Sequence, residues 1–283
     1  MNLRHALLAA MFLIAAFSCA TSAQETKIKW FGHAAFSITT PKGKVLLIDP
    51  WLTNPKNPDV VAGKDPLAAV PKVDYILLTH GHRDHVGEAV EIARRTGAIL
   101  IANPELAGNL VKLTDFPAKQ AQTDAIMGIG GEIQIADGEV TVAMTPAIHT
   151  SSVYNAKAGP NEPERAYGGS PAGFVIVVKN GPTIYHTGDT AYFGDMALIG
   201  EQYQIDVALI NIGGHTAMEP KMAARAAKAV RAKLAIPQHF GTDEGMTPNA
   251  NSFATELKVL KVPFYEMKPG ETILYRGRAM LRK

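Results

Sequence analysis

Four side chains that can bind metal ions stand within six consecutive positions, His80-Gly81-His82-Arg83-Asp84-His85. They follow an apolar run, residues 75–79, that is typical of a buried strand, and they precede residues 86–95, which have the apolar spacing of a helix. Two positions apart in an extended turn, His80 and His82 can point to the same side, whereas Asp84 and His85 start the helix and point differently. Such a turn can supply ligands to two metal ions but cannot complete the coordination of either. The chain must therefore fold to bring further ligands to the end of this strand.

The first 23 residues differ from the rest of the chain. Arg4 precedes an apolar run over residues 6–17, and the small residues Thr21-Ser22-Ala23 follow it. This is the pattern of a secretory signal peptide cleaved after Ala23. The apolar run is shorter than the roughly 20 residues that cross a membrane, so we expect no stable membrane span. The segment Ala16-Phe17-Ser18-Cys19 faintly resembles a lipoprotein cleavage box, which is the alternative. We predict an exported protein, periplasmic or secreted, with residues 24–283 as a single domain.

The only cysteine, Cys19, lies within this leader, so the predicted mature chain has no thiolate to offer a metal. Imidazole and carboxylate ligands suit zinc best, with manganese, iron or nickel as alternatives. The missing thiolates argue against a closed structural zinc site, so we expect a coordination position open to substrate.

Composition excludes several other classes of protein. The chain is 47% apolar and 19% charged, which is ordinary for a globular enzyme and excludes a disordered chain. Its 28 basic and 26 acidic residues are spread along the sequence and give a formal charge of +2. No basic stripe is present, so no nucleic-acid partner is expected and the substrate should be a small molecule. The oligomeric state is left open.

Short β-type runs open the predicted mature chain, and β-type runs alternate with helical patterns later. Expected helices cover residues 86–95, 104–112, 220–233 and 252–260. Residues 50–72 and 152–173 are rich in proline and in asparagine or glycine and are predicted to be long loops. The second of these is either a mobile loop over the site or a solvated insertion. The pattern indicates a layered α/β or α+β architecture.

Further candidate ligands follow three downstream β-type runs: His149, Asp189 and His239. Each lies where a loop leaves a strand, and such loops converge at one edge of a sheet. Taken alone, any of the three is more easily a hydrogen-bonded histidine or a turn aspartate.

Together with residues 79–85, these positions resemble the metal-binding series of the metallo-β-lactamase superfamily. The resemblance extends to Trp30-Phe31-Gly32-His33-Ala34-Ala35-Phe36, Leu47-Ile48-Asp49-Pro50, Tyr185-His186-Thr187-Gly188-Asp189-Thr190 and Pro237-Gln238-His239-Phe240. These motifs are similar to those of uncharacterised metal-dependent hydrolases related to L-ascorbate 6-phosphate lactonase and, more distantly, to N-acyl-phosphatidylethanolamine phospholipase D. The match covers residues 26–276 and implies a four-layer αβ/βα sandwich.

The resemblance also implies the arrangement of the ligands around two divalent metal ions. A first ion would be held by His80, His82 and His149, a second by Asp84, His85 and His239, and Asp189 would bridge both. A hydroxide between two cations is a nucleophile at neutral pH, so the implied reaction is its attack on a carbonyl or phosphoryl centre, with Asp84 orienting the water.

Two other histidines are candidate catalytic residues. His33 lies in the opening motif of the resemblance and either contacts substrate or is a hydrogen-bonded structural residue. His215, in Gly213-Gly214-His215-Thr216-Ala217-Met218, is a candidate proton donor or oxyanion stabiliser, or else an ordinary loop histidine. The corresponding segment of the relatives carries an adjacent Thr-Met pair, which Ala217 interrupts here.

Several neighbours of the predicted ligands are assigned lesser roles. Asp49 and His186 are expected to hydrogen-bond to metal ligands without themselves being catalytic. Arg83 either meets an anionic substrate or is solvated.

The sequence therefore predicts an exported dinuclear hydrolase that cleaves an ester, a lactone or a related bond. A phosphodiesterase or phospholipase D-like hydrolase is the first alternative, and β-lactam hydrolysis is supported by the superfamily name alone. A non-catalytic metal-binding protein, which would have a closed site, is the alternative from another class.

Overall fold

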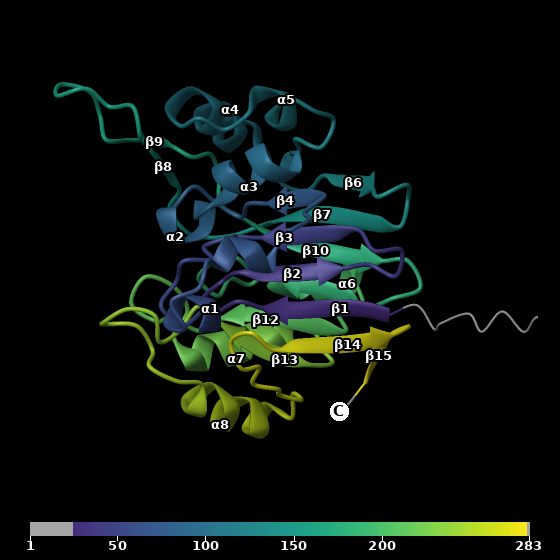
Figure 1. The fold of residues 1–283 in the computed structure, drawn as a ribbon. Coiled ribbons are helices and arrows are strands. Elements are labelled where there is room, and N and C mark those ends of the chain that lie inside the picture. The colour runs from purple at the N-terminus through teal and green to yellow at the C-terminus, as the bar shows by residue number, and fades with distance from the viewer. Residues whose placement is uncertain (1–24, 282–283) are drawn as a thin grey trace, which may run out of the picture.

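Two mixed β-sheets lie face to face in the computed structural model (Figure 1), which describes residues 25–281. The predicted signal peptide lies outside the described residues. In spatial order the first sheet consists of β15 (Ala279–Leu281), β14 (Thr272–Arg276), β1 (Glu25–Trp30), β2 (Phe36–Thr39), β3 (Val45–Ile48), β4 (Tyr75–Leu77) and β5 (Ile99–Ile101). The second consists of β13 (Ala235–Gln238), β12 (Val207–Asn211), β11 (Thr183–His186), β10 (Ala172–Val178), β7 (Val140–Pro146) and β6 (Glu132–Ile135).

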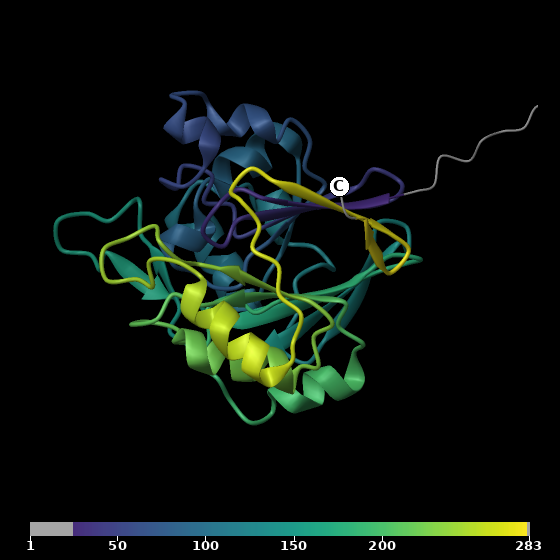
Figure 2. The same cartoon turned by 90° about the horizontal axis from the view of Figure 1, so that it is seen from below.

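Helices cover the outer face of each sheet (Figure 2). The first sheet is covered by segments from the first half of the chain: α1 (Pro58–Val61), the 3-10 helix η1 (Pro66–Ala69), α2 (Arg83–Val86), α3 (Ala89–Thr96), α4 (Pro104–Leu113) and α5 (Ala118–Ala121). The second is covered by α6 (Met196–Gln202), α7 (Pro220–Ala229) and α8 (Asn251–Leu260). The predicted four-layer αβ/βα arrangement is confirmed.

Three apolar clusters fill the spaces between the four layers. One lies between the sheets, where Phe36, Phe174 and Ile236 meet. A second joins the outer face of the second sheet to α6, α7 and α8. A third joins the outer face of the first sheet to α3 and α4. Strands such as β3 and β12 are buried on both faces, which explains their continuous apolar sequence.

The helical pattern at residues 220–233 correctly predicts the buried face of α7, where Ala223, Ala226, Ala227 and Val230 are fully buried. The helix itself ends earlier, at Ala229. Asn103 caps α4 as expected, since its side chain accepts a hydrogen bond from the Leu106 amide.

The single helix predicted for residues 86–95 is wrong. The chain forms α2 and then α3, and Gly87 breaks them with φ +43°. A Cβ at Gly87 would lie 2.4 Å from the Pro50 carbonyl oxygen, so this turn is packed against the loop after β3. The break turns Asp84 and His85 toward the sheet edge independently of α3.

The predicted long loops contain regular elements. Residues 50–72 form α1 and η1, whose first turns are capped by the side chains of Asn57 and Asp65. Residues 152–173 contain the hairpin of β8 (Ser152–Tyr154) and β9 (Arg165–Tyr167), tied to α4 by Asn109, which donates to the Tyr167 carbonyl. These elements, like α6 and β15, are too short to have a clear periodicity. No helix among residues 25–281 is long and apolar enough to cross a membrane.

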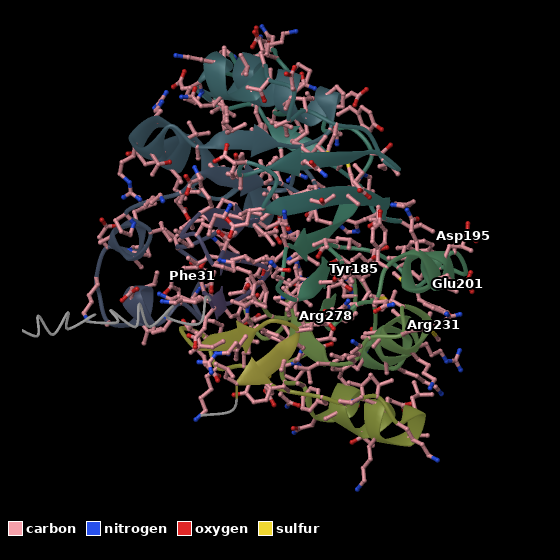
Figure 3. The ribbon with its side chains drawn as sticks, turned by 90° about the vertical axis from the view of Figure 1, so that its right-hand side faces the viewer. Phe31, Tyr185, Asp195, Glu201, Arg231 and Arg278 are labelled. Carbon is pink, nitrogen blue, oxygen red and sulfur yellow. The ribbon has the colours of Figure 1, made fainter. Side chains whose placement is uncertain are left out.

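The contact between α6 and α7 allows a stability prediction. Glu201 on α6 pairs with Arg231, which follows α7, at 3.0 Å, and both are labelled in Figure 3. A Cβ at Gly200 on α6 would lie 2.6 Å from the Val230 backbone. Gly200→Ala should therefore lower the free energy of unfolding by about 1–3 kcal/mol, as overpacking does. Gly108 on α4 meets no atom within 4 Å, so Gly108→Ala should stabilise by about 0.5–1 kcal/mol. Urea unfolding measures both, and equal shifts would refute close packing at Gly200.

Candidate metal centre

The candidate ligands lie in loops that leave the carboxyl ends of five strands. His33 follows β1, the His80–His85 turn follows β4, and His149, Asp189 and His239 follow β7, β11 and β13. Strands β1 and β4 run in the same direction in the first sheet, as do β7, β11 and β13 in the second. The loops therefore meet at one edge of the sandwich, which is where ligands bind in open α/β sheets.

All seven predicted metal ligands come together at this edge. Their donor atoms form overlapping groups in which every atom lies within 4.8 Å of the others: His80, His82 and His149; His80, His85 and Asp189; and His33, Asp84, His85 and His239. The first group is the predicted first metal set, and the last contains the predicted second set. It also includes His33, for which the sequence left open a contact with substrate or a structural role.

The Asp189 carboxylate is the centre of the arrangement. Its Oδ2 lies 3.5 Å from His85 Nε2, 3.7 Å from His149 Nε2 and 3.1 Å from His239 Nε2. The Nε2 atoms of His85 and His239 are buried and make no hydrogen bond. Buried polar atoms are rarely left without a partner, so ring nitrogens converging on one carboxylate oxygen fit bound cations. The donor set of imidazole and carboxylate suits the divalent ions expected from the sequence.

Asp49, at the end of β3, fixes the ring nitrogens of two of these histidines. Its carboxylate accepts hydrogen bonds from the Thr79 amide at 2.9 Å, the Thr79 hydroxyl at 2.7 Å and His85 Nδ1 at 2.8 Å. Because the single Thr79 hydroxyl proton goes to Asp49, Thr79 must accept from His80 Nδ1, which lies 3.0 Å away. Nδ1 of both histidines is thereby engaged, which leaves Nε2 as the atom that would bind a metal. In this structure His85 Nε2 has no hydrogen-bond partner, and His80 Nε2 lies 2.9 Å from His82 Nδ1. Asp49 acts through His85, as the sequence predicted.

His33 links the two halves of the site. Its carbonyl accepts from the His239 amide, and its Nε2 lies 3.1 Å from Asp84 Oδ2. Burial, reinforced by His239, lowers the pKa of His33 to about 4, so the ring is neutral. With Nε2 donating to Asp84, Nδ1 must accept from the Thr242 hydroxyl at 2.6 Å. His33 thus holds Asp84 in place and also faces the cavity described below.

Electrostatics at the site favour positive charge between the carboxylates. Burial would lower the pKa of His239, but the adjacent Asp189 outweighs it and raises that pKa to about 9. The charges of Asp189 and Asp49 likewise raise the pKa of His85 well above its usual value despite burial. Burial would raise the pKa of Asp189, but His239 and His85 hold it well below its usual range. Burial lowers the pKa of His80, His82 and His149, which keeps them neutral and able to bind a metal.

Other predicted residues take different positions. His186 donates from Nε2 to the Ala34 carbonyl and accepts from the Gly188 amide at Nδ1, so it braces the backbone before Asp189 and not a ligand side chain. Gly188 has φ +57°, and a Cβ there would lie 2.6 Å from the Ala172 carbonyl oxygen, so this turn requires glycine. The structure does not bring His215 to the cluster. It is exposed and lines a separate hollow with Glu219.

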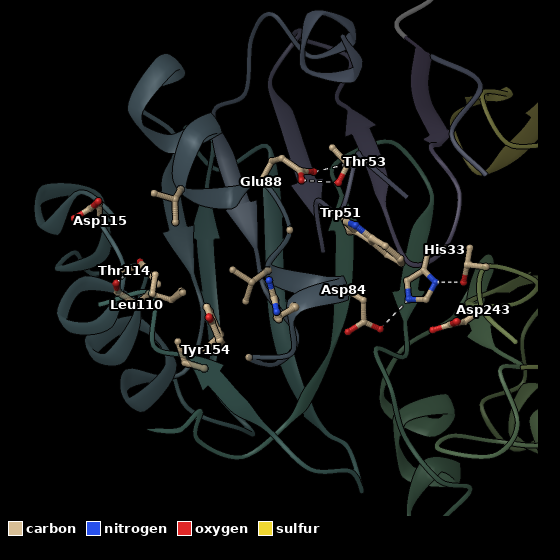
Figure 4. A pocket seen from close by; sticks show the side chains of 18 of the residues that line it. His33, Trp51, Thr53, Asp84, Glu88, Leu110, Thr114, Asp115, Tyr154 and Asp243 are labelled. Carbon is tan, nitrogen blue, oxygen red and sulfur yellow. Dashed lines mark hydrogen bonds and ion pairs between the residues drawn. The ribbon is translucent and has the colours of Figure 1, made fainter. Parts of the chain in front are cut away.

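A cavity of about 840 Å³ adjoins the cluster (Figure 4). Figure 4 shows His33 and Asp84 toward one side, with Trp51 beside them, and Leu110, Thr114 and Asp115 toward the other. The Asp84 side chain is 34% exposed, so its carboxylate can be reached from the cavity. The site therefore has the open side expected of a catalytic centre.

Sequence reasoning missed Trp51, Thr242 and Ser151. Trp51 packs edge-on against His33 at 4.8 Å between ring centroids, and Ser151 accepts from the Gly81 amide within the metal-binding turn. Each lies within two residues of a quoted motif or a predicted ligand, which is the only signal that could have found it.

Comparison with known proteins agrees with this geometry. Residues 44–240 match the family model described as the beta-lactamase superfamily domain. The chain is 46% identical over 251 residues to a "UPF0173 metal-dependent hydrolase" of Thermodesulfovibrio yellowstonii, covering 88% of this chain and 91% of that protein. A protein of the same description from Pyrobaculum calidifontis is 41% identical, with coverage of 87% and 99%. The solved structure of Igni18, titled a novel metallo hydrolase from the archaeon Ignicoccus hospitalis, matches at TM-score 0.72 and 33% identity, with coverage of 88% and 98%.

Proposed function

Because this chain belongs to the beta-lactamase superfamily and its close relatives are metal-dependent hydrolases, we propose that it is a dinuclear hydrolase of carboxylic esters or lactones. The observation that carries the proposal is the convergence of seven imidazole and carboxylate side chains beside an open cavity. The predicted superfamily and enzyme class are confirmed, and the number of metals and the substrate are part of the proposal.

The residues fit two ions that share Asp189. His80, His82 and His149 would hold one, and Asp84, His85 and His239 the other, with His33 adjoining the second group. Bound divalent ions lower the pKa of water and polarise a substrate oxygen, which supplies both a nucleophile and an electrophile at neutral pH. We favour zinc, with manganese, iron or nickel as alternatives.

The protein's own side chains orient the reactants. The Asp84 carboxylate faces the cavity and can accept a hydrogen bond from the attacking water, while the neutral His33 ring keeps that carboxylate in place. In the overall reaction, water adds to the carbonyl carbon, the ester carbon–oxygen bond breaks and the alcohol leaves with a proton. Trp51 and Met246 line the same cavity.

A second function, phosphodiester hydrolysis, is favoured by one observation. Arg83 and Arg165 line a smaller cavity of about 220 Å³ together with His82 and Asp84. Guanidinium groups beside a metal centre suit an anionic phosphoryl substrate. The Arg83 guanidinium, however, already lies 4.4 Å from the Tyr154 ring centre, and it packs on that ring. We therefore rank the ester and lactone reaction first.

Metal analysis of the purified chain tests the proposal. We expect about two divalent ions per chain, together with turnover of esters or lactones that is lost on chelation and regained when metal returns. A panel with a phosphodiester, a lactone, a simple ester and a β-lactam identifies the bond. Two bound metals without turnover of any of these would favour the non-catalytic metal-binding protein, and absence of metal would refute the ligand assignment.

We also propose that the enzyme acts outside the cytoplasm, which the leader pattern of residues 1–23 supports. Amino-terminal sequencing of the protein recovered from expressing cells should begin at Gln24. A chain that retains Met1 to Ala23 would contradict export.

A further inference from the structure

The large cavity has an apolar arm that leads away from the metal centre. The name apolar arm is used for the part of the cavity whose wall is formed by Trp51, Val86, Val90, Leu110 and Val153. Leu110 and Val153 are buried, and they belong to the apolar cluster beneath the helices that cover the first sheet, against which Val86 and Val90 also pack. The accessible surface of the arm therefore comes from the half-buried side chains of Trp51, Val86 and Val90, with Leu110 and Val153 packed behind them.

The arm begins at the catalytic position itself. Trp51 stands edge-on to His33, and His33 and Asp84 line the same cavity as the arm. Figure 4 shows Trp51 beside Asp84 and His33, with Leu110 and Thr114 farther along the cavity. A substrate whose reacting carbon lies at Asp84 can therefore place one of its substituents against these apolar side chains.

Three of the charged side chains that line the cavity, Glu88, Arg94 and Asp115, have partners within the protein. Glu88 accepts hydrogen bonds from the amides of Leu52 and Thr53, so its carboxylate is satisfied. Arg94 pairs with Asp115 at 3.3 Å, and Asp115 also pairs with Lys157 at 3.3 Å. Arg83 also lines the cavity, and its guanidinium packs on the Tyr154 ring 4.4 Å from the ring centre. The wall between these charged groups is apolar and favours an apolar substituent.

We propose that the apolar arm binds the acyl chain of the substrate, so that the enzyme acts on esters or lactones of medium-chain carboxylic acids. This inference rests on the proposed function and names the substrate class for the same site. Each methylene group buried along the arm strengthens binding by up to about fourfold. A contact that stabilises the bound substrate and the transition state equally lowers KM and leaves kcat unchanged.

A chain-length series tests the proposal through the acid released. Ethyl acetate, ethyl butyrate and ethyl octanoate have the same leaving group, so their rates differ only through the acyl chain. We expect KM to fall at least about tenfold from acetate to octanoate, with kcat changing little.

Val90→Asp is the variant that should remove this preference. Val90 is half-buried in the first turn of α3, where an aspartate is compatible with the helix and places a charge on the arm. We expect the KM advantage of octanoate over acetate to disappear. Leu198→Asp is the matched control, because Leu198 is 59% exposed in the first turn of α6, on the other outer layer. It should retain the preference.

A binding measurement separates this inference from the proposed function. The chain has two tryptophans, Trp30 and Trp51, and Trp30 is buried in the core. The ketone 2-decanone, which cannot be hydrolysed, should change the fluorescence of Trp51 at concentrations where acetone does not. Trp51→Phe should abolish the signal, and Val90→Asp should weaken binding at least about tenfold.

The outcomes are distinct. Ester turnover whose KM does not depend on chain length would refute acyl-chain binding by the apolar arm but would support the proposed hydrolase function. Binding of 2-decanone that depends on Val90, without turnover of any ester, would support the arm and refute ester hydrolysis. A fluorescence response that is unchanged in Val90→Asp would overturn the arm, whatever the enzyme hydrolyses.

Discussion

Asp189→Ala should abolish metal binding at the second position and reduce hydrolysis to below about 1% of the wild-type rate, because even residues that only support metal ligands contribute 10–100-fold. Asp189 Oδ2 is the one carboxylate oxygen that faces His85, His149 and His239 together. Without it, the remaining imidazoles lack the negative charge that would offset two divalent cations. Metal content by mass spectrometry and turnover of an ester measure the two effects.

The matched control is Asp195→Ala. Asp195 precedes α6, is exposed, and makes no capping hydrogen bond with its side chain (Figure 3). This variant should keep the wild-type metal content and activity. If Asp189→Ala still binds two ions per chain, Asp189 does not bridge them, and the dinuclear arrangement must be assigned differently.

Asp49→Ala should weaken metal binding by about 10–100-fold although Asp49 is not itself a predicted ligand. The change removes the acceptor of His85 Nδ1 and of the Thr79 hydroxyl, so both His80 and His85 lose the interactions that orient their rings. It also leaves the Thr79 amide buried without a partner, which should lower the free energy of unfolding by about 3 kcal/mol. Metal titration and urea unfolding of the metal-free protein measure these effects separately.

Asp206→Ala distinguishes positioning from general destabilisation. Asp206 is also buried, and its carboxylate accepts from the Thr183 amide, Lys233 and Arg278, but it precedes β12, at the opposite edge from the metal centre. It should destabilise the fold to a similar degree and leave metal affinity unchanged. Equal losses of metal affinity in the two variants would show that Asp49 acts only through stability.

Sequence patterns predicted continuous apolar runs and amphipathic faces well, and breaks between elements poorly. The buried run of β3 and the amphipathic face of α7 are each recorded in consecutive residues, so their periodicity is visible without the fold. The break at Gly87 is not, because it depends on the Pro50 carbonyl, which lies 37 positions earlier and comes within 2.4 Å of where a Cβ would be. Only tertiary contact reveals why the helix cannot continue there.

For the candidate site, too, the sequence determined some features and the tertiary structure decided others. The sequence determined the chemistry: which donor atoms are available, that thiolates are absent from residues 24–283, and that the ligand positions follow strands. The tertiary structure decided the geometry, because ring orientation and proton position depend on partners distant in the chain. His33 joins Asp84 and Thr242 across separations of 51 and 209 residues. Asp49 orients the ring of His85 directly and the ring of His80 through Thr79. The apolar arm likewise exists only where α2, α3, α4 and β8 meet, since its side chains have no common pattern in the sequence.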